Sequence, residues 1–335
     1  MRPKRIKEII AKACDHPADT PPLHLWGPPG IGKSAIIKQV TIEKAIGFVD
    51  MRMALRDPTD LRGIPVPENG TARWLPPSDL PKDGQGILFL DELTSAPPLT
   101  QAGGYQLTLD RAIGEYQLPD GWYVIAAGNR LEDRAVVYRM STALANRFIH
   151  INYDVNLDDW IEWAMHTGIE PTIIAFIHWR GGDLLFAFDP ASSEKAFPTP
   201  RTWEFASKIM RVASKNTMAE TLEGTVGKGA AAEFMAFLKV QTELPDPLEI
   251  LNKASTFVPS RLDLKYALVS ALASRAAGTK HCEALLKYST HLPKEFSVLL
   301  IQLLATKERD NIMTAPSYTG WVREHSDIVL PRRAS

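Results

Sequence analysis

The sequence of 335 residues has little cysteine and no excess of charge of one sign. Its two cysteines, Cys14 and Cys282, are far apart and outside any metal or redox spacing, which argues against a disulfide scaffold and favours a reducing, cytoplasmic setting. The formal net charge of -1 provides no overall basic field of the kind that attracts nucleic acid. We therefore expect a cytoplasmic protein without a nucleic-acid partner.

Long apolar runs, internal repeats and clustered metal ligands are also missing. No stretch approaches the length of a membrane span, and the basic start at Met1–Arg5 is not followed by an apolar run typical of a signal peptide. The eight histidines form no ligand spacing with one another or with the cysteines, and no Ser/His/Asp signature is legible. With 45% hydrophobic and 23% charged residues, the composition is that of an ordinary globular protein, long enough for two domains.

The centre of the sequence is a stretch that fits the phosphate-loop pattern: a glycine, four residues, then Gly-Lys-Ser. The apolar segment 23–26 before it predicts a strand, and apolar residues at helical spacing follow it. Glycines let backbone N–H groups surround phosphates, Lys33 can neutralise the β- and γ-phosphates, and Ser34 can ligate magnesium. The alternative is a fortuitous glycine turn before an ordinary helix. The predicted nucleotide-binding residues are Gly27, Pro28, Pro29, Gly30, Ile31, Gly32, Lys33 and Ser34.

Two acids follow the apolar segment 86–90, which predicts a buried strand of a parallel sheet. The carboxyl edge of such a sheet is where ligands bind. Asp91 is predicted to hold magnesium, directly or through water, and Glu92 is predicted to polarise the attacking water. The alternative is a common acid that caps the start of a helix. The position of the pair downstream of Lys33 favours the catalytic interpretation.

Two further side chains are candidates beyond this strand. Segments 114–118 and 122–126 flank a Pro-Asp-Gly turn and are predicted to form a hairpin, and the second of them leads to Asn129. The Asn129 amide is predicted to orient water or contact the γ-phosphate, against a plain turn-forming role. Arg147 ends a helix just before a strand, so it either caps helix carbonyls or reaches the γ-phosphate of another subunit.

The remaining regions differ in character. Residues 57–82 carry six prolines, so no helical or strand period is expected there, and an ordered surface loop is favoured over a floppy linker. Past residue 155 the chain is predicted to be helical, and Arg201 heads a helix where it can reach back toward bound nucleotide. Helices are predicted at 5–15, 98–110, 230–243, 261–277, 281–289 and 293–307.

Taken in order, these motifs resemble the AAA+ ATPase module over about residues 20–215. The segments that resemble its Walker A, Walker B, sensor 1, arginine finger and sensor 2 are Gly27–Ser34, Leu90–Glu92, Asn129, Leu144–Phe148 and Pro200–Arg201. Softer signals are similar to the MoxR branch of that family. They are Arg56–Gly63, Ile113–Tyr116, Leu118–Gly121 and Ala127–Arg130.

The resemblance implies an α/β fold, with a P-loop three-layer α/β/α core and a mostly parallel sheet, followed by an α-helical lid and further C-terminal helices. We expect the core at 1–153 with its insertion at 57–82, a lid with sensor 2 at 154–215, and a helical extension at 216–335. The extension is either an enlarged lid or a separate docking domain. The resemblance also implies a hexameric ring of copies of this chain, with ATP and magnesium at the subunit boundaries and Arg147 acting on the neighbour's nucleotide.

For activity, the resemblance implies a Mg-ATP-dependent ATPase that remodels, assembles or activates a protein partner in a chaperone-like way. MoxR relatives often have a von Willebrand factor A domain protein as partner. No aromatic-glycine pore loop is visible, which argues against threading of substrate. One alternative is an ATPase that loads or initiates on nucleic acid, although no basic stripe or helix-turn-helix is visible. Another is a nucleotide-gated scaffold with little turnover. A role in trans for Arg134 or Arg139 is left open.

Overall fold

The structure is a computed structural model that describes residues 1–133, 137–253 and 255–326. It divides into two compact units: Met1–Asn156 together with Asp189–Ser192 form the first, and Leu157–Phe188 with the chain from Ser193 on form the second. Arg134 lies outside the described residues, as does the end of the predicted extension.

The first unit is built on a five-stranded sheet in which every pairing is parallel, with the strand order β2-β5-β8-β1-β9. The strands are β1 (Leu23–Trp26), β2 (Gly47–Arg52), β5 (Gly86–Asp91), β8 (Trp122–Gly128) and β9 (Ile149–Asn152). Trp26 is in register with Gly128, and Leu90 is in register with Ala126. The residues that follow β1, β5 and β8 therefore emerge at one edge of the sheet, where parallel sheets bind ligands.

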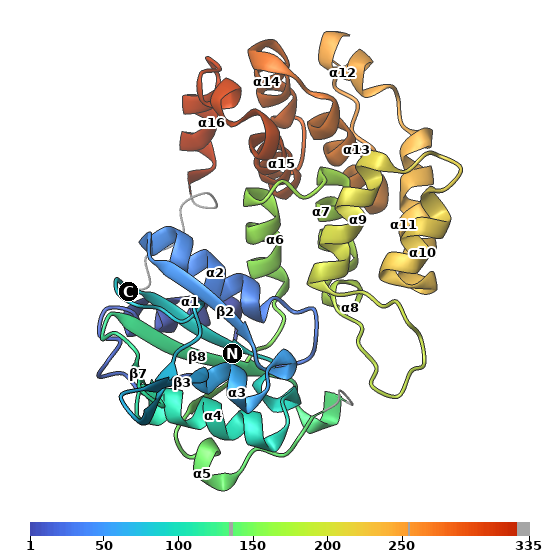
Figure 1. Cartoon of the computed structure of the whole chain (residues 1–335). Coiled ribbons are helices and arrows are strands. Elements are labelled where there is room, and N and C mark those ends of the chain that lie inside the picture. The colour runs from blue at the N-terminus through green and yellow to red at the C-terminus, as the bar shows by residue number, and fades with distance from the viewer. Residues whose placement is uncertain (134–136, 254, 327–335) are drawn as a thin grey trace. The chain divides into compact units, whose positions relative to one another are not determined.

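Helices cover both faces of this sheet, which makes the three-layer α/β/α core that the sequence predicts (Figure 1). The helices are α1 (Pro3–Ala13) and α2 (Lys33–Lys44) on one face and α4 (Pro98–Leu109) on the other. Leu88 and Leu90 of β5 join the same buried cluster as Leu107 of α4. Their neighbours Ile87 and Phe89 point to the opposite face and are also fully buried. A strand covered on both faces must be apolar along its length, which explains the continuous run that precedes Asp91.

The predicted hairpin between 114–118 and 122–126 is wrong. Segment 122–126 belongs to β8, whose two edges are already occupied by β5 and β1 in parallel pairing. The antiparallel pair is instead β6 (Ala112–Ile113) with β7 (Tyr116–Gln117), and Gly114 in their turn has a φ of 58°. The Pro-Asp-Gly turn connects this small hairpin to the central strand β8.

The prediction that residues 57–82 lack regular structure is also wrong. They contain α3 (Pro58–Arg62) and a two-stranded antiparallel sheet of β3 (Ile64–Glu68) and β4 (Thr71–Leu75). Pro65 and Pro67 are two residues apart in β3, so both nitrogens face the same side of the strand. Because proline has no N–H, that side must be the outer edge, which has no partner strand among the described residues.

The insertion is anchored rather than loose. Leu61 of α3 is fully buried and Leu80 nearly so, and both belong to the cluster beneath the sheet. The backbone N–H of Trp74 donates to Glu115 in the β6–β7 turn at 3.1 Å, and the guanidinium of Arg62 lies 4.1 Å from the centre of the Trp74 ring. These contacts fix an ordered surface element, as the sequence favours.

The second unit is helical and includes most of the segment predicted as the lid, except residues 154–156 and 189–192, together with the described part of segment 216–335. Its core contains aromatic side chains from several helices packed at tilted angles, with the ring of Phe176 at 5.0 to 5.6 Å from the rings of Trp203, Phe234 and Phe237. None of the helices in the described part of the chain is long and apolar enough to cross a membrane.

The remaining elements are short turns of the first unit and the helices of the second. The first unit also contains η1 (Met53–Leu55), η2 (Leu93–Ser95), η3 (Leu131–Asp133) and α5 (Thr142–Ala145). The second unit contains α6 (Leu157–His166), α7 (Pro171–Arg180), α8 (Gly182–Leu185), α9 (Pro200–Val212), α10 (Met218–Val226), α11 (Lys228–Val240), η4 (Gln241–Glu243), α12 (Pro247–Lys253), α13 (Leu262–Arg275), α14 (Gly278–Ser289), α15 (Lys294–Met313) and α16 (Tyr318–Glu324).

Candidate nucleotide-binding site

The glycine-rich loop joins the carboxyl end of β1 to the amino end of α2. Gly30 and Gly32 have φ values of 78° and 103°, a region that residues with a Cβ rarely adopt. A Cβ on Gly27 would lie 2.6 Å from Cδ1 of Ile31 and 3.1 Å from the backbone carbonyl of Tyr153, so this position is also tightly packed. The helix that starts at Lys33 directs its first backbone N–H groups toward the loop, which makes a concave site for an anion.

Lys33 reaches across the loop to the neighbouring strand. Its Nζ donates to the carbonyls of Gly27 at 2.6 Å and Pro28 at 2.9 Å, and to Oδ1 of Asn129 at 3.1 Å. Asn129 directly follows β8, which lies beside β1 in the sheet. The structure therefore brings together Lys33 and Asn129, two candidates that are far apart in the sequence.

Ser34 and Asp91 form the second contact between distant motifs. The Ser34 hydroxyl donates to Oδ2 of Asp91 at 2.9 Å, and Asp91 is the last residue of β5. A hydroxyl beside a carboxylate is a donor set that fits magnesium, which binds proteins through one or two oxygen ligands and takes phosphate oxygens for the rest. No group of three or more His, Cys, Asp or Glu side chains suited to a metal occurs among the described residues, so an all-protein metal cage is absent from that part of the chain.

A third carboxylate, that of Asp50, is affected by the charge of Asp91. Burial raises the pKa of Asp50 on β2, and the negative charge of Asp91 nearby raises it further. A magnesium ion beside Asp91 would relieve this repulsion between carboxylates.

Glu92 has an unusual backbone. Its φ of 55° and ψ of 33° are left-handed, which costs a residue with a side chain about 1–2 kcal/mol. Its backbone N–H donates to Oδ1 of Asp91 at 2.9 Å, so the turn is tied to the preceding carboxylate. Such a conformation persists only where surrounding structure enforces it, and it is typical of functional sites.

Two residues near the site were missed by the sequence analysis. The hydroxyl of Thr94 donates to the carbonyl of Asn129 at 3.2 Å, and a Cβ on Gly128 would lie 2.4 Å from that hydroxyl. The backbone carbonyl of Tyr153 would lie 3.1 Å from a Cβ on Gly27. Thr94 sits just after the acid pair, which was a usable signal, whereas nothing in the sequence links Tyr153 to the loop.

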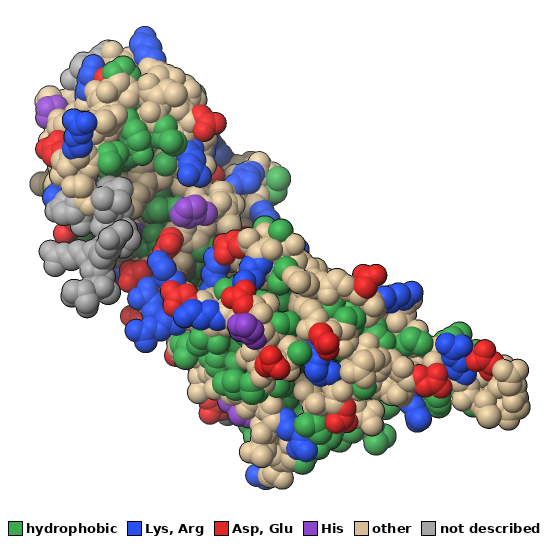
Figure 2. Space-filling model, turned by 90° about the vertical axis from the view of Figure 1, so that its left-hand side faces the viewer, with side chains coloured by type: hydrophobic (Ala, Val, Ile, Leu, Met, Phe, Trp, Pro, Cys, Tyr) green, Lys and Arg blue, Asp and Glu red, His purple; other side chains and the backbone are tan. Residues whose placement is uncertain are grey.

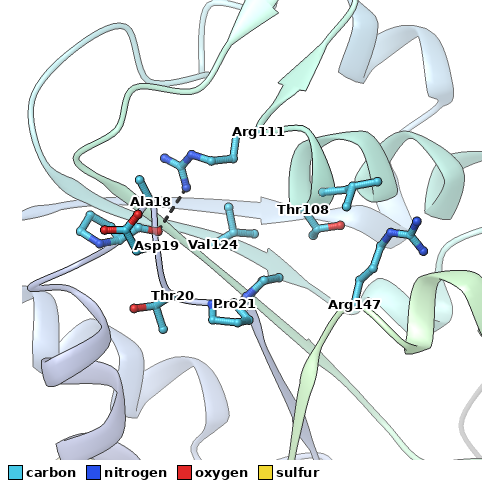
Figure 3. Close-up of a pocket in the computed structure, with 11 residues that line it drawn as sticks. Ala18, Asp19, Thr20, Pro21, Thr108, Arg111, Val124 and Arg147 are labelled. Atoms are coloured by element: carbon cyan, nitrogen blue, oxygen red, sulfur yellow. Dashed lines mark hydrogen bonds between the residues drawn. The ribbon is translucent and has the colours of Figure 1, made fainter.

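Arg147 lies at the other edge of the sheet. It precedes β9, whose Ile149 pairs with Leu23 at the amino end of β1, while the phosphate loop follows the carboxyl end of β1. The four residues of β1 span roughly 13 Å, so Arg147 lies at the opposite edge of the sheet from its own loop. It lines a pocket of about 260 Å³ together with Thr108 and Arg111 (Figure 3).

The Arg147 guanidinium has two contacts within the chain. Its Nη1 donates to the carbonyl of Ala143 at 2.6 Å, as the helix-capping interpretation predicts, and it lies 4.4 Å from the centre of the Tyr105 ring. Its Nε is buried without a hydrogen-bond partner among the described residues. These contacts hold the arginine in place at this edge of the sheet.

Arg201 belongs to the second unit. It lies in the first turn of α9, where Thr199 and Thr202 form a reciprocal capping box, and its side chain is exposed. Its reach to nucleotide stays a prediction. Arg139 is exposed in the segment before α5.

The arrangement around Lys33 defines a class of site: a phosphate loop with an acid pair and an amide at the same sheet edge. No protein-family model matches the sequence, and no curated protein matches it either. Solved structures with a similar architecture include a candidate ATPase from Cytophaga hutchinsonii, 13% identical, covering 96% of this chain and 88% of that chain with a TM-score of 0.36.

Two further structures are NtrX from Brucella abortus in complex with ADP and the RuvB Holliday junction branch migration motor from Thermotoga maritima. NtrX is 14% identical, with coverage of 92% of this chain and 68% of that chain and a TM-score of 0.41. RuvB is 16% identical, with coverage of 75% and 76% and a TM-score of 0.37. At these low identities and scores, the likeness assigns no function to this chain.

Proposed function

We propose that this chain is a Mg-ATP-dependent ATPase of the AAA+ type. The observation that carries the proposal is the pair of hydrogen bonds that join separate motifs at one sheet edge, from Lys33 to Asn129 and from Ser34 to Asp91. A fortuitous glycine turn has no reason to meet a carboxylate and an amide from two neighbouring strands. ATP is the expected substrate because the loop, the lysine and the helix start all favour a polyphosphate.

The chemistry is hydrolysis of the terminal phosphoanhydride by water. The Lys33 ammonium offsets charge on the β- and γ-phosphates, and the Glu92 carboxylate accepts the proton of the attacking water. The Asn129 amide orients that water or contacts the γ-phosphate. Magnesium, held by Ser34 and Asp91, would neutralise phosphate charge. Catalysis of this kind consists of positioning and electrostatic stabilisation and forms no covalent intermediate.

We further propose that the site is completed by a second copy of the chain. Support comes from Arg147, which lies at the edge of the sheet opposite its own loop and has a side chain that is only partly buried. Presented to a neighbour, it would stabilise the transition-state charge of that neighbour's site. A closed ring, hexameric in the resembled family, repeats this contact at every boundary. Arg201 is proposed to contact the nucleotide from the second unit.

For the target, we propose a protein partner that is remodelled or activated, as in the MoxR branch, with a von Willebrand factor A domain protein as the first candidate. The formal net charge of -1 supports a protein rather than a nucleic acid. On the face shown in Figure 2, acidic and basic side chains are interspersed.

Glu92→Gln tests the catalytic assignment. The variant should bind ATP as the wild type does, because the amide keeps the size of the side chain, but its steady-state turnover should fall by at least about 100-fold, because the general base is lost. Glu132→Gln, an exposed acid of η3, is the matched control and should retain turnover. Full turnover by Glu92→Gln, or wild-type turnover no greater than that of Lys33→Ala, would overturn the proposal.

A further inference from the structure

A hydrogen-bonded relay connects the strand before the phosphate loop to the turn that carries Arg147. It begins at Trp26, the residue directly before Gly27. The indole Nε1 of Trp26 donates to Nδ1 of His150 on β9 at 2.8 Å. The two strands are parallel with His24 opposite His150, so Trp26 and His150 lie on the same face of the sheet, diagonally across the ladder.

The other nitrogen of the same ring continues the relay. Nε2 of His150 lies 2.8 Å from the carbonyl of Ala145, the last residue of α5. An indole N–H can only donate and a carbonyl can only accept. Both bonds therefore exist together only when His150 is neutral and carries its proton on Nε2. The ring thus joins one fixed donor to one fixed acceptor.

The acceptor belongs to an element that needs outside support. Helix α5 has only four residues, far fewer than a helix needs to persist by itself in water. The carbonyl of Ala145, its last residue, accepts from the backbone N–H of Phe148 at 3.2 Å, and His150 supplies a second, shorter contact to the same oxygen. Arg147 follows directly: its backbone N–H donates to Leu144 and its guanidinium donates to Ala143. The position of α5 therefore sets the position of the arginine.

Aromatic neighbours hold the His150 ring. The rings of Trp26 and His24 lie 5.8 and 5.9 Å from it, and His24 lies 4.1 Å from Trp26. His24 is fully buried, and neither of its nitrogens has a partner among the described residues, so it acts as an apolar packing element. It orients the relay without competing for its hydrogen bonds.

We propose that His150 is a positioning residue for the trans-acting Arg147, anchored through Trp26 on the strand that ends in the phosphate loop. This inference rests on the proposed function, in which Arg147 serves the neighbouring subunit. Its consequence is directional. Loss of the relay should impair a subunit as a donor of Arg147 and leave its own phosphate site intact.

Mixed assemblies separate these two roles. In a mixture of Lys33→Ala and Arg147→Ala proteins, active sites form only where an Arg147→Ala subunit supplies the loop and a Lys33→Ala subunit supplies the arginine. His150→Phe, which keeps a ring but removes both hydrogen bonds, is added to one partner at a time. Added to the Lys33→Ala partner, it should lower the restored kcat by at least about tenfold with little change in KM. The reason is that displacement of a catalytic group by about 1 Å can lower the rate about 100-fold. Added to the Arg147→Ala partner, it should change neither.

Three further variants complete the test. His150→Gln in the Lys33→Ala partner keeps a donor toward Ala145 and should recover part of the loss. Trp26→Phe in that partner removes only the anchoring N–H and should give a smaller loss in the same direction. His166→Phe, which alters an exposed histidine that also contacts a backbone carbonyl, is the matched control and should have no effect.

The outcomes distinguish the two proposals. Equal loss from His150→Phe in either partner, or no loss in both, would overturn the relay while leaving the shared site standing. Failure of the unaltered Lys33→Ala and Arg147→Ala pair to restore any turnover, with assembly confirmed, would remove the trans role of Arg147, and the relay would fall with it.

Discussion

Lys33 is the residue on which nucleotide affinity depends. Its ammonium is surrounded by two backbone carbonyls and one amide oxygen, all within 3.1 Å. These acceptors hold the amine over the loop, where the charge can pair with phosphate. Hydrogen bonds to charged groups contribute about 1.5–3 kcal/mol.

Lys33→Ala should therefore weaken ATP binding by about ten- to 100-fold. Calorimetric titration with ATP and magnesium measures the change. Lys44→Ala, at the far end of the same helix, removes an exposed ion pair with Asp15 and is the matched control. Equal affinity of the two variants would contradict the assigned role.

His24 makes the stability of the first unit depend on pH. Burial lowers its pKa to about 3, and the charge of Lys33 acts in the same direction. The unfolded chain binds a proton near the ordinary histidine pKa of about 6.5, whereas the folded chain does not. The free energy of unfolding should thus be highest above about pH 6.5 and fall as the pH drops toward 3, by up to about tenfold in the unfolding equilibrium for each pH unit.

His24→Phe removes that titration and keeps an aromatic ring between Trp26 and Phe148. Urea denaturation of the variant and the wild type at several pH values gives the free energy of unfolding as a function of pH. The difference between the two slopes reports His24, since the contributions of all other groups cancel. If the two proteins had the same slope, His24 would bind its proton equally well in the folded and the unfolded chain, which contradicts the prediction.

At the scale of elements, the sheet edge depends on a close approach between β8 and η2. Gly128 has no side chain, and this lets Thr94 approach closely enough to donate to Asn129. The same strand end also accepts a hydrogen bond from the backbone of Gly27 at 3.3 Å. Gly128 therefore supports the position of Asn129 as well as that of the phosphate loop.

Gly128→Ala should destabilise the first unit by about 1–3 kcal/mol, the usual cost of overpacking. Thr94→Ala in the same chain should recover part of that loss, because the clashing hydroxyl is gone. Gly229→Ala, at a helical glycine with open space around it, is the control and should be neutral or slightly stabilising. Chemical denaturation measures all three. Strictly additive losses for Gly128→Ala and Thr94→Ala would contradict the packing argument.

The elements differ in how far the sequence predicts them. The strand, glycine loop and helix around Lys33, and the apolar strand before Asp91, are written in consecutive residues and could be predicted from the sequence. The partners of β8 could not, because pairing in a parallel sheet is decided by strands that are distant in the chain. His150 was missed for the same reason: its partner Trp26 lies 124 residues away. The prolines of β3 led to the wrong prediction that no strand forms there. Proline is compatible with a strand when its nitrogen faces an edge without a partner, and the sequence does not show which edge that is.

At the scale of the whole molecule, the proposed site exists only in an assembly. Specific activity should then rise with subunit concentration and fall on serial dilution, because isolated subunits lack the neighbour's arginine. Steady-state ATPase assays with light scattering in parallel measure both quantities. Arg147→Ala should show low activity that does not change with dilution. Constant wild-type activity per subunit, with dissociation observed, would argue for a site complete in one chain.

The proline-bearing hairpin has a consequence for any such assembly. Ring formation would bring many identical copies of β3 to a high local concentration, a situation in which bare strand edges usually fuse into continuous sheets. Nitrogens without hydrogen cannot take part in that fusion. An edge that lacks these donors cannot complete a hydrogen-bonded ladder, so the hairpins of neighbouring subunits would not join into a continuous sheet through β3.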